Sequence, residues 1–306
     1  MKVSALAGGV GGAKLLRGLQ RALTPGDLTA VVNTGDDDRI YGLHVAPDLD
    51  IVTYWLAGRA DTQRGWGLAG DTFRVVDALG DLGAENWFRL GDVDLATCLY
   101  RTERMEAGAR LSEVTDEIRS AFDVPTRILP MTDDPLATKV RSADGRTLSF
   151  QEYFVRERTE PEVVELIYEG AGSASAAPGV IGALEGSDVI VVCPSNPVLS
   201  IAPILALKGL PEMLQAHPRV VAVSPIVGGV ALKGPADRLL RSLGHDASAS
   251  SVARLYSDFC DVFVVDQTDA GEVDTIERLG CRAVALDTVM VDERASESLA
   301  RSIMSL

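Results

Sequence analysis

Short apolar runs alternate along this chain with segments whose apolar residues recur at helical spacing. Val3–Ala7 is the first apolar run, a helical pattern follows from Ala13 to about Leu23, and Leu28–Asn33 is the second run. Two parallel strands need a crossover between them, and a helix usually supplies it. The start of the chain therefore predicts a βαβ unit.

The same pattern returns in the last third of the chain, at 188–193, 219–223 and 261–265. Each of these runs is rich in β-branched residues and is followed by turn residues and a helical stretch. Continuous apolar strands of this kind are typical of a sheet covered on both faces. We therefore predict an α/β fold with a doubly wound, mostly parallel, Rossmann-like sheet.

The middle of the chain has a different pattern. Helical spacing dominates from Asp48 to about Phe122, and two strand-like segments, 137–141 and 146–150, flank a turn at Asp144-Gly145 that predicts a β-hairpin. We predict two units: a Rossmann-like nucleotide-binding core (1–60 plus 170–306) and a mainly helical insertion (61–169) over the mouth of the sheet. Four helices are expected in this middle part, over 49–57, 72–82, 95–106 and 111–122.

A glycine-rich loop lies where the first strand turns into the first helix. It comprises Gly8, Gly9, Val10, Gly11 and Gly12. Glycines at this place let the backbone approach a phosphate and point N–H groups at it. The loop matches neither the dinucleotide pattern GxGxxG nor the P-loop pattern, so a tight structural turn is the alternative. Lys14 either adds a cation near the helix start or is an ordinary solvated helix residue.

Acidic residues follow the second strand. Asp36, Asp37 and Asp38 come directly after it, and Asp48 and Asp50 open the next helical segment. One or two carboxylates together with substrate phosphates are a usual environment for Mg²⁺, and we predict Asp36, Asp37 and Asp50 as its ligands. The alternative is ordinary: Asp48 caps a helix and Asp38 is a solvated loop charge.

Two further loops of small polar residues follow predicted strands. Ser195 and Asn196 come after the strand ending at Cys193, and Ser224 and Pro225 come after the one ending at Val223. Open α/β sheets bind ligands at the carboxyl ends of their strands, so we expect these loops to meet the glycine and aspartate loops at one site. Either loop taken alone is equally typical of a plain turn.

The charge balance and the cysteines narrow the class of protein. The formal net charge of −15 argues against a nucleic-acid or anionic-membrane surface. Four widely spaced cysteines form neither a zinc motif nor a disulfide framework, and no apolar stretch approaches the roughly 18 residues of a membrane span. We expect a cytoplasmic protein that acts on small molecules.

These loops, in this order, resemble the family of 2-phospho-L-lactate and phosphoenolpyruvyl transferases of coenzyme F-420 biosynthesis. The resemblance spans residues 3 to about 290 without large gaps. It is carried by GGVGGAKLLRGL from Gly8, VVNTGDD from Val31, PDLDIVTYWLAG from Pro47, RGWG from Arg64, RLGDVDLAT from Arg89, ILPMTDDP from Ile128, FQEYFVRER from Phe150, PSNPVLSIAPIL from Pro194, and VAVSPIVGG with GPA from Val221.

The resemblance implies an activity and a set of site residues. Such enzymes pass the acid-bearing phosphoryl group of a guanosine diphosphate ester to the ribityl hydroxyl of a deazaflavin precursor, releasing GMP with Mg²⁺ present. By this likeness Asp50 and Arg89 contact the deazaflavin. The guanosine phosphates are held by the glycine loop, Lys14 and the two serine loops. Asp50, supported by Asp36, is the predicted catalytic residue, which orients or deprotonates the hydroxyl.

The resemblance also bears on the donor and on assembly. The first loop is similar to bacterial members of the family, which suggests a phosphoenolpyruvyl rather than a phospholactyl donor, without deciding between them. We also expect a homodimer.

Two other classes of protein compete with this interpretation. One is a non-catalytic nucleotide-sugar-binding regulator of the same superfamily, which shares the glycine-rich opening. Such a regulator is not expected to carry the segments around Asp50, Arg89 and Ile128. The other is a nicotinamide dehydrogenase, which the missing GxGxxG pattern disfavours.

Overall fold

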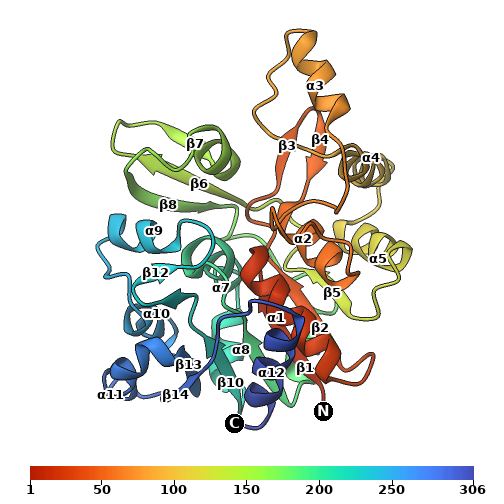
Figure 1. Cartoon of the computed structure of the whole chain (residues 1–306). Helices are drawn as coiled ribbons and strands as arrows, with labels where there is room; N and C mark the ends of the chain where they lie inside the picture. Colours follow the sequence, from red (N-terminus) through yellow and green to blue (C-terminus); the bar gives the residue numbers. More distant parts are fainter.

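A computed structural model describes all 306 residues and shows a seven-stranded sheet at the centre of the molecule (Figure 1). Every neighbouring pair of its strands is parallel. This confirms the predicted doubly wound α/β fold. In spatial order the strands are β5 (Arg127–Pro130), β2 (Leu28–Val32), β1 (Val3–Ala7), β9 (Val189–Val192), β10 (Val220–Val223), β13 (Val262–Asp266) and β14 (Arg282–Leu286).

The strand order reverses beside β1. From β1 the chain builds outward through β2 to β5, and it then returns to the other side of β1 to add β9, β10, β13 and β14. At such a switch point the two adjoining loops leave in opposite directions, and the crevice between them is where doubly wound folds bind ligands. Here those two loops are the glycine loop after β1 and the Pro194–Asn196 loop after β9.

Each face of the sheet has its own apolar core, because successive strand residues point to opposite faces. Ala5, Val32 and Val191 belong to one buried cluster, and Leu6, Val31 and Ile190 belong to the other. The first core is covered by α1 (Gly9–Ala22), α2 (Pro47–Leu56), α5 (Leu111–Ala121) and α12 (Glu293–Met304). The second is covered by α6 (Val180–Glu185), α7 (Ala202–Leu205), α8 (Leu210–Ala216), α9 (Ala236–Ser242), α10 (Ala249–Tyr256) and α11 (Val273–Glu277).

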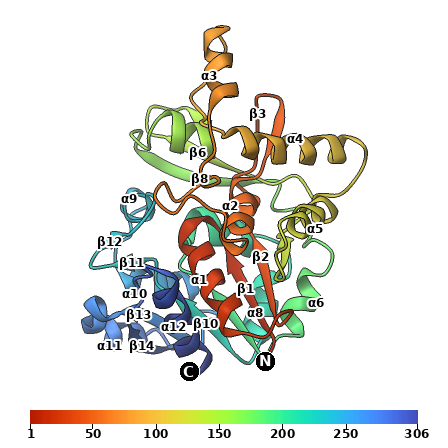
Figure 2. The same cartoon turned by 45° about the vertical axis from the view of Figure 1, so that its right-hand side comes forward.

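A cap lies over the carboxyl ends of the strands, while both chain termini lie at the opposite end of the molecule (Figures 1 and 2). Its elements are α3 (Arg74–Asp81), α4 (Asp92–Glu106) and two small antiparallel sheets. One sheet pairs β3 (Asp38–Ile40) with β4 (Leu43–Val45), and the other has β6 (Ala137–Ser142) between β7 (Thr147–Ser149) and β8 (Val163–Glu169). The β6–β7 pair confirms the predicted hairpin. A third antiparallel pair, β11 (Ile226–Val227) with β12 (Val230–Ala231), follows β10.

The structure divides the chain between core and cap differently from the division expected from sequence. β5 falls inside the segment assigned to the insertion, yet it pairs with β2 as the edge strand of the central sheet. The cap is therefore built from chain on both sides of β5, and it also takes β3 and β4 from before residue 60. β5 is only four residues long and ends in a proline, which suits an edge strand and leaves a weak sequence signal.

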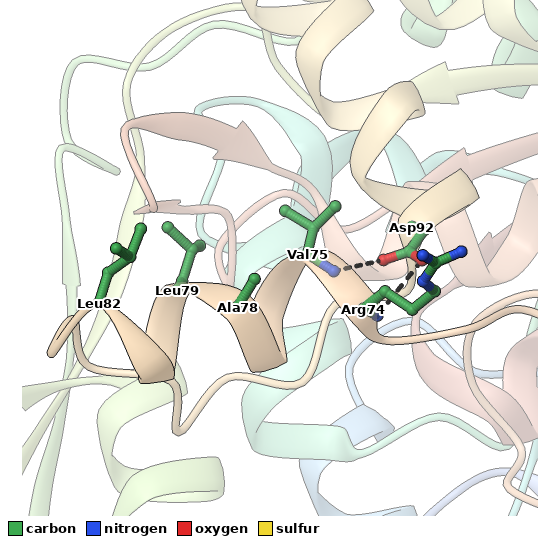
Figure 3. A pocket seen from close by; sticks show the side chains of 6 residues that line it. All are labelled: Arg74, Val75, Ala78, Leu79, Leu82 and Asp92. Carbon is green, nitrogen blue, oxygen red and sulfur yellow. Dashed lines mark hydrogen bonds between the residues drawn. The ribbon is translucent and has the colours of Figure 1, made fainter.

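The outermost element of the cap is α3, which points away from the core (Figure 1). Its start is held by Asp92, whose carboxylate accepts hydrogen bonds from the backbone N–H groups of Arg74 and Val75 (Figure 3). Val75, Ala78, Leu79 and Leu82 follow one another along one side of the helix and line a shallow hollow of about 510 Å³. This hollow offers mostly aliphatic surface and no cluster of groups that could perform chemistry.

No single helix is both long and apolar enough to cross a membrane. One bent pair, Pro197–Leu205 with Leu210–Ala216, passes that test by length and composition only.

Candidate active site

A cavity of about 700 Å³ opens at the carboxyl ends of the central strands, between the core and the cap. The glycine loop, the aspartate loop and both serine loops contribute to its wall, whereas no residue of the segment from Ile128 to Pro135 does. The residues predicted for the site that line it are Gly9, Val10, Gly11, Lys14, Asp36, Asp50, Arg89, Ser195, Asn196, Ser224 and Pro225.

The glycine loop packs directly against the loop after β9. The Gly8 N–H donates a hydrogen bond to Oγ of Ser195 over 3.0 Å. A Cβ at Gly11 would overlap the carbonyl oxygen of Pro194, and one at Gly12 would lie 2.6 Å from Oγ of Ser195. Gly11 and Gly12 are thus required for close approach of the two loops, which is a structural role. The first-turn N–H groups of α1 lack partners within the helix, and Val10 and Gly11 present this end to the cavity.

Asp36 and Asp48 form a buried pair of carboxylates on the cavity wall. The Asn33 side-chain amide donates to both, over 3.1 Å to Asp36 and 3.0 Å to Asp48. Burial raises the pKa of Asp48 to about 6, and burial together with the nearby Asp48 charge raises the pKa of Asp36 well above its usual range. Burial is the larger cause of both shifts, because it disfavours the charged form of each carboxyl group.

Asp48 belongs to the acidic cluster noted in the sequence but is not one of its three predicted metal ligands, and a helix cap was its alternative role. It lies in the first turn of α2, whose N-cap is Ala46, and it makes no cap for that helix. Its Oδ1 instead accepts a hydrogen bond of 2.7 Å from the Gly9 N–H, at the N-terminus of α1. A carboxylate is stabilised there by the helix dipole. No sequence signal links Asp48 to Gly9, because the contact joins residues 39 positions apart.

Asp50 lies in a buried ionic network where α2 meets α4 at the cavity. Its carboxylate is paired with the guanidinium of Arg101, which is only 1% exposed, and one of the two contacts is an Nη1–Oδ2 hydrogen bond of 3.1 Å. Burial raises the pKa of Asp50, while the Arg101 charge opposes that shift. Arg101 escaped the sequence analysis because an arginine inside a charged helix is usually solvated.

Asp94 extends this network. Its carboxyl accepts a hydrogen bond of 2.7 Å from the Tyr54 hydroxyl. Burial, together with the Asp50 charge, raises the pKa of Asp94 to about 7. Asp50, Asp94 and Cys98 bring their ligand atoms within 4.8 Å of one another. Arg101 already neutralises Asp50, however, and a thiol is a poor ligand for Mg²⁺, so this trio does not suit that ion.

Aromatic side chains form another part of the cavity wall. Trp66, Phe88, Phe150 and Phe154 all line the cavity, and Phe150 stacks on Phe154 with ring centroids 5.4 Å apart. Arg89 lies at this wall, where its guanidinium is 4.8 Å from the Phe73 ring centroid and donates to Asp77 over 2.6 Å. Such surfaces suit a flat heteroaromatic ligand.

The remaining predicted residues have clear local roles. The Asn196 side chain caps the helical turn that follows it, accepting from the Val198 and Leu199 N–H groups. The Ser224 hydroxyl closes a turn with Ile226. Asp37 points to His44, with 2.9 Å between Oδ2 and Nε2, and is not among the residues lining the cavity.

Comparison with known proteins bears on what this cavity does. The sequence model of one family, described as 2-phospho-L-lactate transferase CofD, matches residues 3–304. The chain belongs to this family. A phosphoenolpyruvate transferase from Streptomyces griseus is 42% identical, with 100% of this chain and 98% of the relative covered. A 2-phospho-L-lactate transferase from Methanosarcina acetivorans is 40% identical, with 98% and 97% covered.

Among solved structures, a UPF0052-family protein from Bacillus halodurans superposes with a TM-score of 0.67, covering 99% of both chains at 14% identity. At that identity the likeness shows the fold alone. This CofD-family chain is therefore a transferase by its full-length relatives, and it shares its α/β architecture with more distant proteins.

Proposed function

We propose that this CofD-family transferase moves the acid-bearing phosphoryl group of a guanosine diphosphate ester of a three-carbon acid onto the ribityl hydroxyl of the deazaflavin precursor, releasing GMP, in coenzyme F-420 biosynthesis. Full-length relatives of both transferase types support the assignment. The observation that carries it is the cavity at the switch point, which joins a helix N-terminus and paired carboxylates to an aromatic wall.

The two ends of the cavity differ in chemistry, and each suits one substrate. The N-terminus of α1, Ser195 and Ser224 form the end toward the central sheet, where backbone N–H groups favour phosphate oxygens. Arg89 and the phenylalanine rings form the end toward the cap, which suits the tricyclic acceptor. The guanylate therefore binds on the core side and the deazaflavin on the cap side.

The acidic pair fits a magnesium ion. Asp36 and Asp48 offer hard oxygen ligands, they are buried at the cavity wall, and the Asn33 amide holds both carboxylates close together. Of the three ligands predicted from the sequence, Asp36 belongs to this pair. Asp37 is paired with His44 and Asp50 with Arg101. Asp36 and Asp48 would hold Mg²⁺, which would supply charge neutralisation for the donor phosphates.

Asp50 has the geometry of an orienting group. Its pairing with Arg101 favours the ionised carboxylate, which can accept a hydrogen bond from the ribityl hydroxyl without being strongly basic. In the transfer, the hydroxyl oxygen bonds to the phosphorus that carries the acid. The bond from that phosphorus to the GMP oxygen breaks, and the hydroxyl proton is released. Positioning of the two reactants is the main contribution of the protein.

The decisive test is mass analysis of the product after the protein is offered each guanylated acid with the deazaflavin alcohol and Mg²⁺. We expect GMP and an acid-bearing deazaflavin phosphodiester, formed best from the phosphoenolpyruvyl donor. Asp50→Asn is expected to abolish GMP release while the far-UV circular dichroism spectrum stays unchanged. The control is Asp38→Asn, at a charge outside the cavity lining. Full turnover by Asp50→Asn would remove Asp50 from the mechanism.

The magnesium ligands need a separate measurement. In isothermal titration with GDP present, Asp48→Asn and Asp36→Asn are expected to weaken Mg²⁺ binding, while Asp37→Asn is expected to leave it near the wild-type value. If Mg²⁺ binding is lost in Asp37→Asn alone, the ligand is Asp37 and not the pair Asp36 and Asp48.

Assembly and location complete the proposal. A homodimer is expected, and sedimentation equilibrium tests it directly. Four cysteines, all buried and unpaired, support a reducing cytoplasm as the place of the reaction.

A further inference from the structure

Two lysines from distant parts of the chain meet at the cavity. The chain contains only five lysines against 24 arginines, and none of the five forms a salt bridge. Lys14, on the second turn of α1, and Lys233, in the segment between β12 and α9, both line the cavity. Almost all charge pairing in this protein is done by arginine, so two cavity lysines without acidic partners need a separate explanation.

The two ammonium groups are held close to the N-terminus of α1. Lys14 Nζ donates to the Met290 carbonyl oxygen over 2.9 Å and lies 5.8 Å from the Trp55 ring centroid. A Cβ at Gly65 would lie 3.3 Å from Lys233 Nζ and 3.6 Å from Cγ2 of Val10. Lys233 Nζ and the Val10 side chain therefore both lie beside Gly65, which places this ammonium group near the first turn of α1.

The electrostatics of Lys14 agree with this placement. Its pKa is lowered by burial and by the charge of Lys233, so the two cations are close enough to repel each other. An ammonium group has three N–H donors, and only one of those on Lys14 has a partner in the protein. A negatively charged group between the two lysines would relieve the repulsion and use the remaining donors.

The cavity wall carries groups of both charge signs. Asp36 and Asp48 are its buried carboxylates, Asp48 accepts a hydrogen bond from the Gly9 N–H, and Lys14 and Lys233 are its lysines. A ligand with several anionic groups in a row can contact a cation held by the aspartates and the two lysines at the same time. A guanosine diphosphate ester of a carboxylic acid has this form.

We propose that Lys14 and Lys233 form an oxyanion subsite for the donor, occupied by the outer phosphate or by the carboxylate of the transferred acid. This inference rests on the proposed function for the identity of the donor, but not for the existence of the subsite.

The test compares the affinities of wild type, Lys233→Gln and Lys14→Gln for guanosine, GMP, GDP and the guanylated acids, by isothermal titration with Mg²⁺. Lys208→Gln is the matched control, since Lys208 is exposed and lies outside the cavity lining. Losing a charge-assisted hydrogen bond is expected to weaken binding by about tenfold or more in the Lys233 variant, and guanosine binding is expected to stay unchanged. Thermal unfolding checks that each variant is folded.

The ligand series identifies the occupant. Weaker binding of both GDP and the guanylated acid assigns the subsite to the outer phosphate. Weaker binding of the guanylated acid alone assigns it to the carboxylate. Wild-type affinity of Lys233→Gln for every ligand overturns the proposal. If the wild type binds GDP but transfers nothing to the deazaflavin, the proposed function fails while the GDP comparison still tests the subsite.

Discussion

Replacing Arg101 by methionine tests whether the buried pair of Arg101 and Asp50 stabilises the fold. The substitution keeps a long unbranched side chain but removes the guanidinium that faces Asp50. Arg101 is 1% exposed and Asp50 is 5% exposed, so water solvates the carboxylate that is left behind only poorly. The hydrogen bonds from Arg101 to Asp50 and to the His44 carbonyl oxygen are lost as well.

The size of the effect follows from this burial. Removing one partner of a buried ion pair costs about 3–5 kcal/mol, because the other charge stays buried and unpaired. The total stability of a folded domain is about 5–15 kcal/mol, so the loss is a large share of it. Replacing both partners, in Arg101→Met with Asp50→Leu, removes the unpaired charge and is expected to cost less than the sum of the two single changes.

Urea unfolding at several pH values measures this loss. Without Arg101, the pKa of Asp50 is expected to rise further, since burial already raises it and Arg101 opposes the rise. The loss of stability is therefore full where Asp50 is ionised, and it narrows as the pH falls and the carboxyl takes up a proton. A loss below about 1 kcal/mol at neutral pH, with no narrowing in acid, would refute this account of the network.

Two further outcomes can be checked by unfolding experiments. Burial raises the folded-state pKa of Asp94 from 3.8 to about 7, so its contribution to stability is expected to decline as the pH rises through that window. Asp94→Asn should flatten that part of the stability–pH curve, and an unchanged curve would contradict the assignment. Gly11→Ala is expected to lower the melting temperature, because its Cβ would overlap the Pro194 carbonyl oxygen. The control, Gly182→Ala in α6, has open space and should gain about 0.5–1 kcal/mol. Equal changes of melting temperature in the two alanine variants would show that the glycine loop and the Pro194–Asn196 loop can move apart without loss of stability.

The sequence by itself determined the class of fold and the set of loops at the site. Continuous apolar runs such as Val189–Val192 exist because a strand covered on both faces has no polar side, and this signal is local. The loops at Gly9, Asp36, Ser195 and Ser224 were found because each follows such a strand, and parallel strands bring their carboxyl ends to one edge. The resemblance to the family rests on the same local segments.

Tertiary structure alone decided which groups in those loops face one another. The Asp48 carboxylate accepts a hydrogen bond from Gly9 across 39 positions, Asp50 pairs with Arg101 across 51, and Lys233 lies beside Gly65, which is distant from it in the sequence. The charges around a side chain depend on which other elements pack against it. The spacing of residues along the chain does not show these contacts. The short edge strand β5 was missed for a related reason: its place in the sheet depends on pairing with β2 more than on its own four residues.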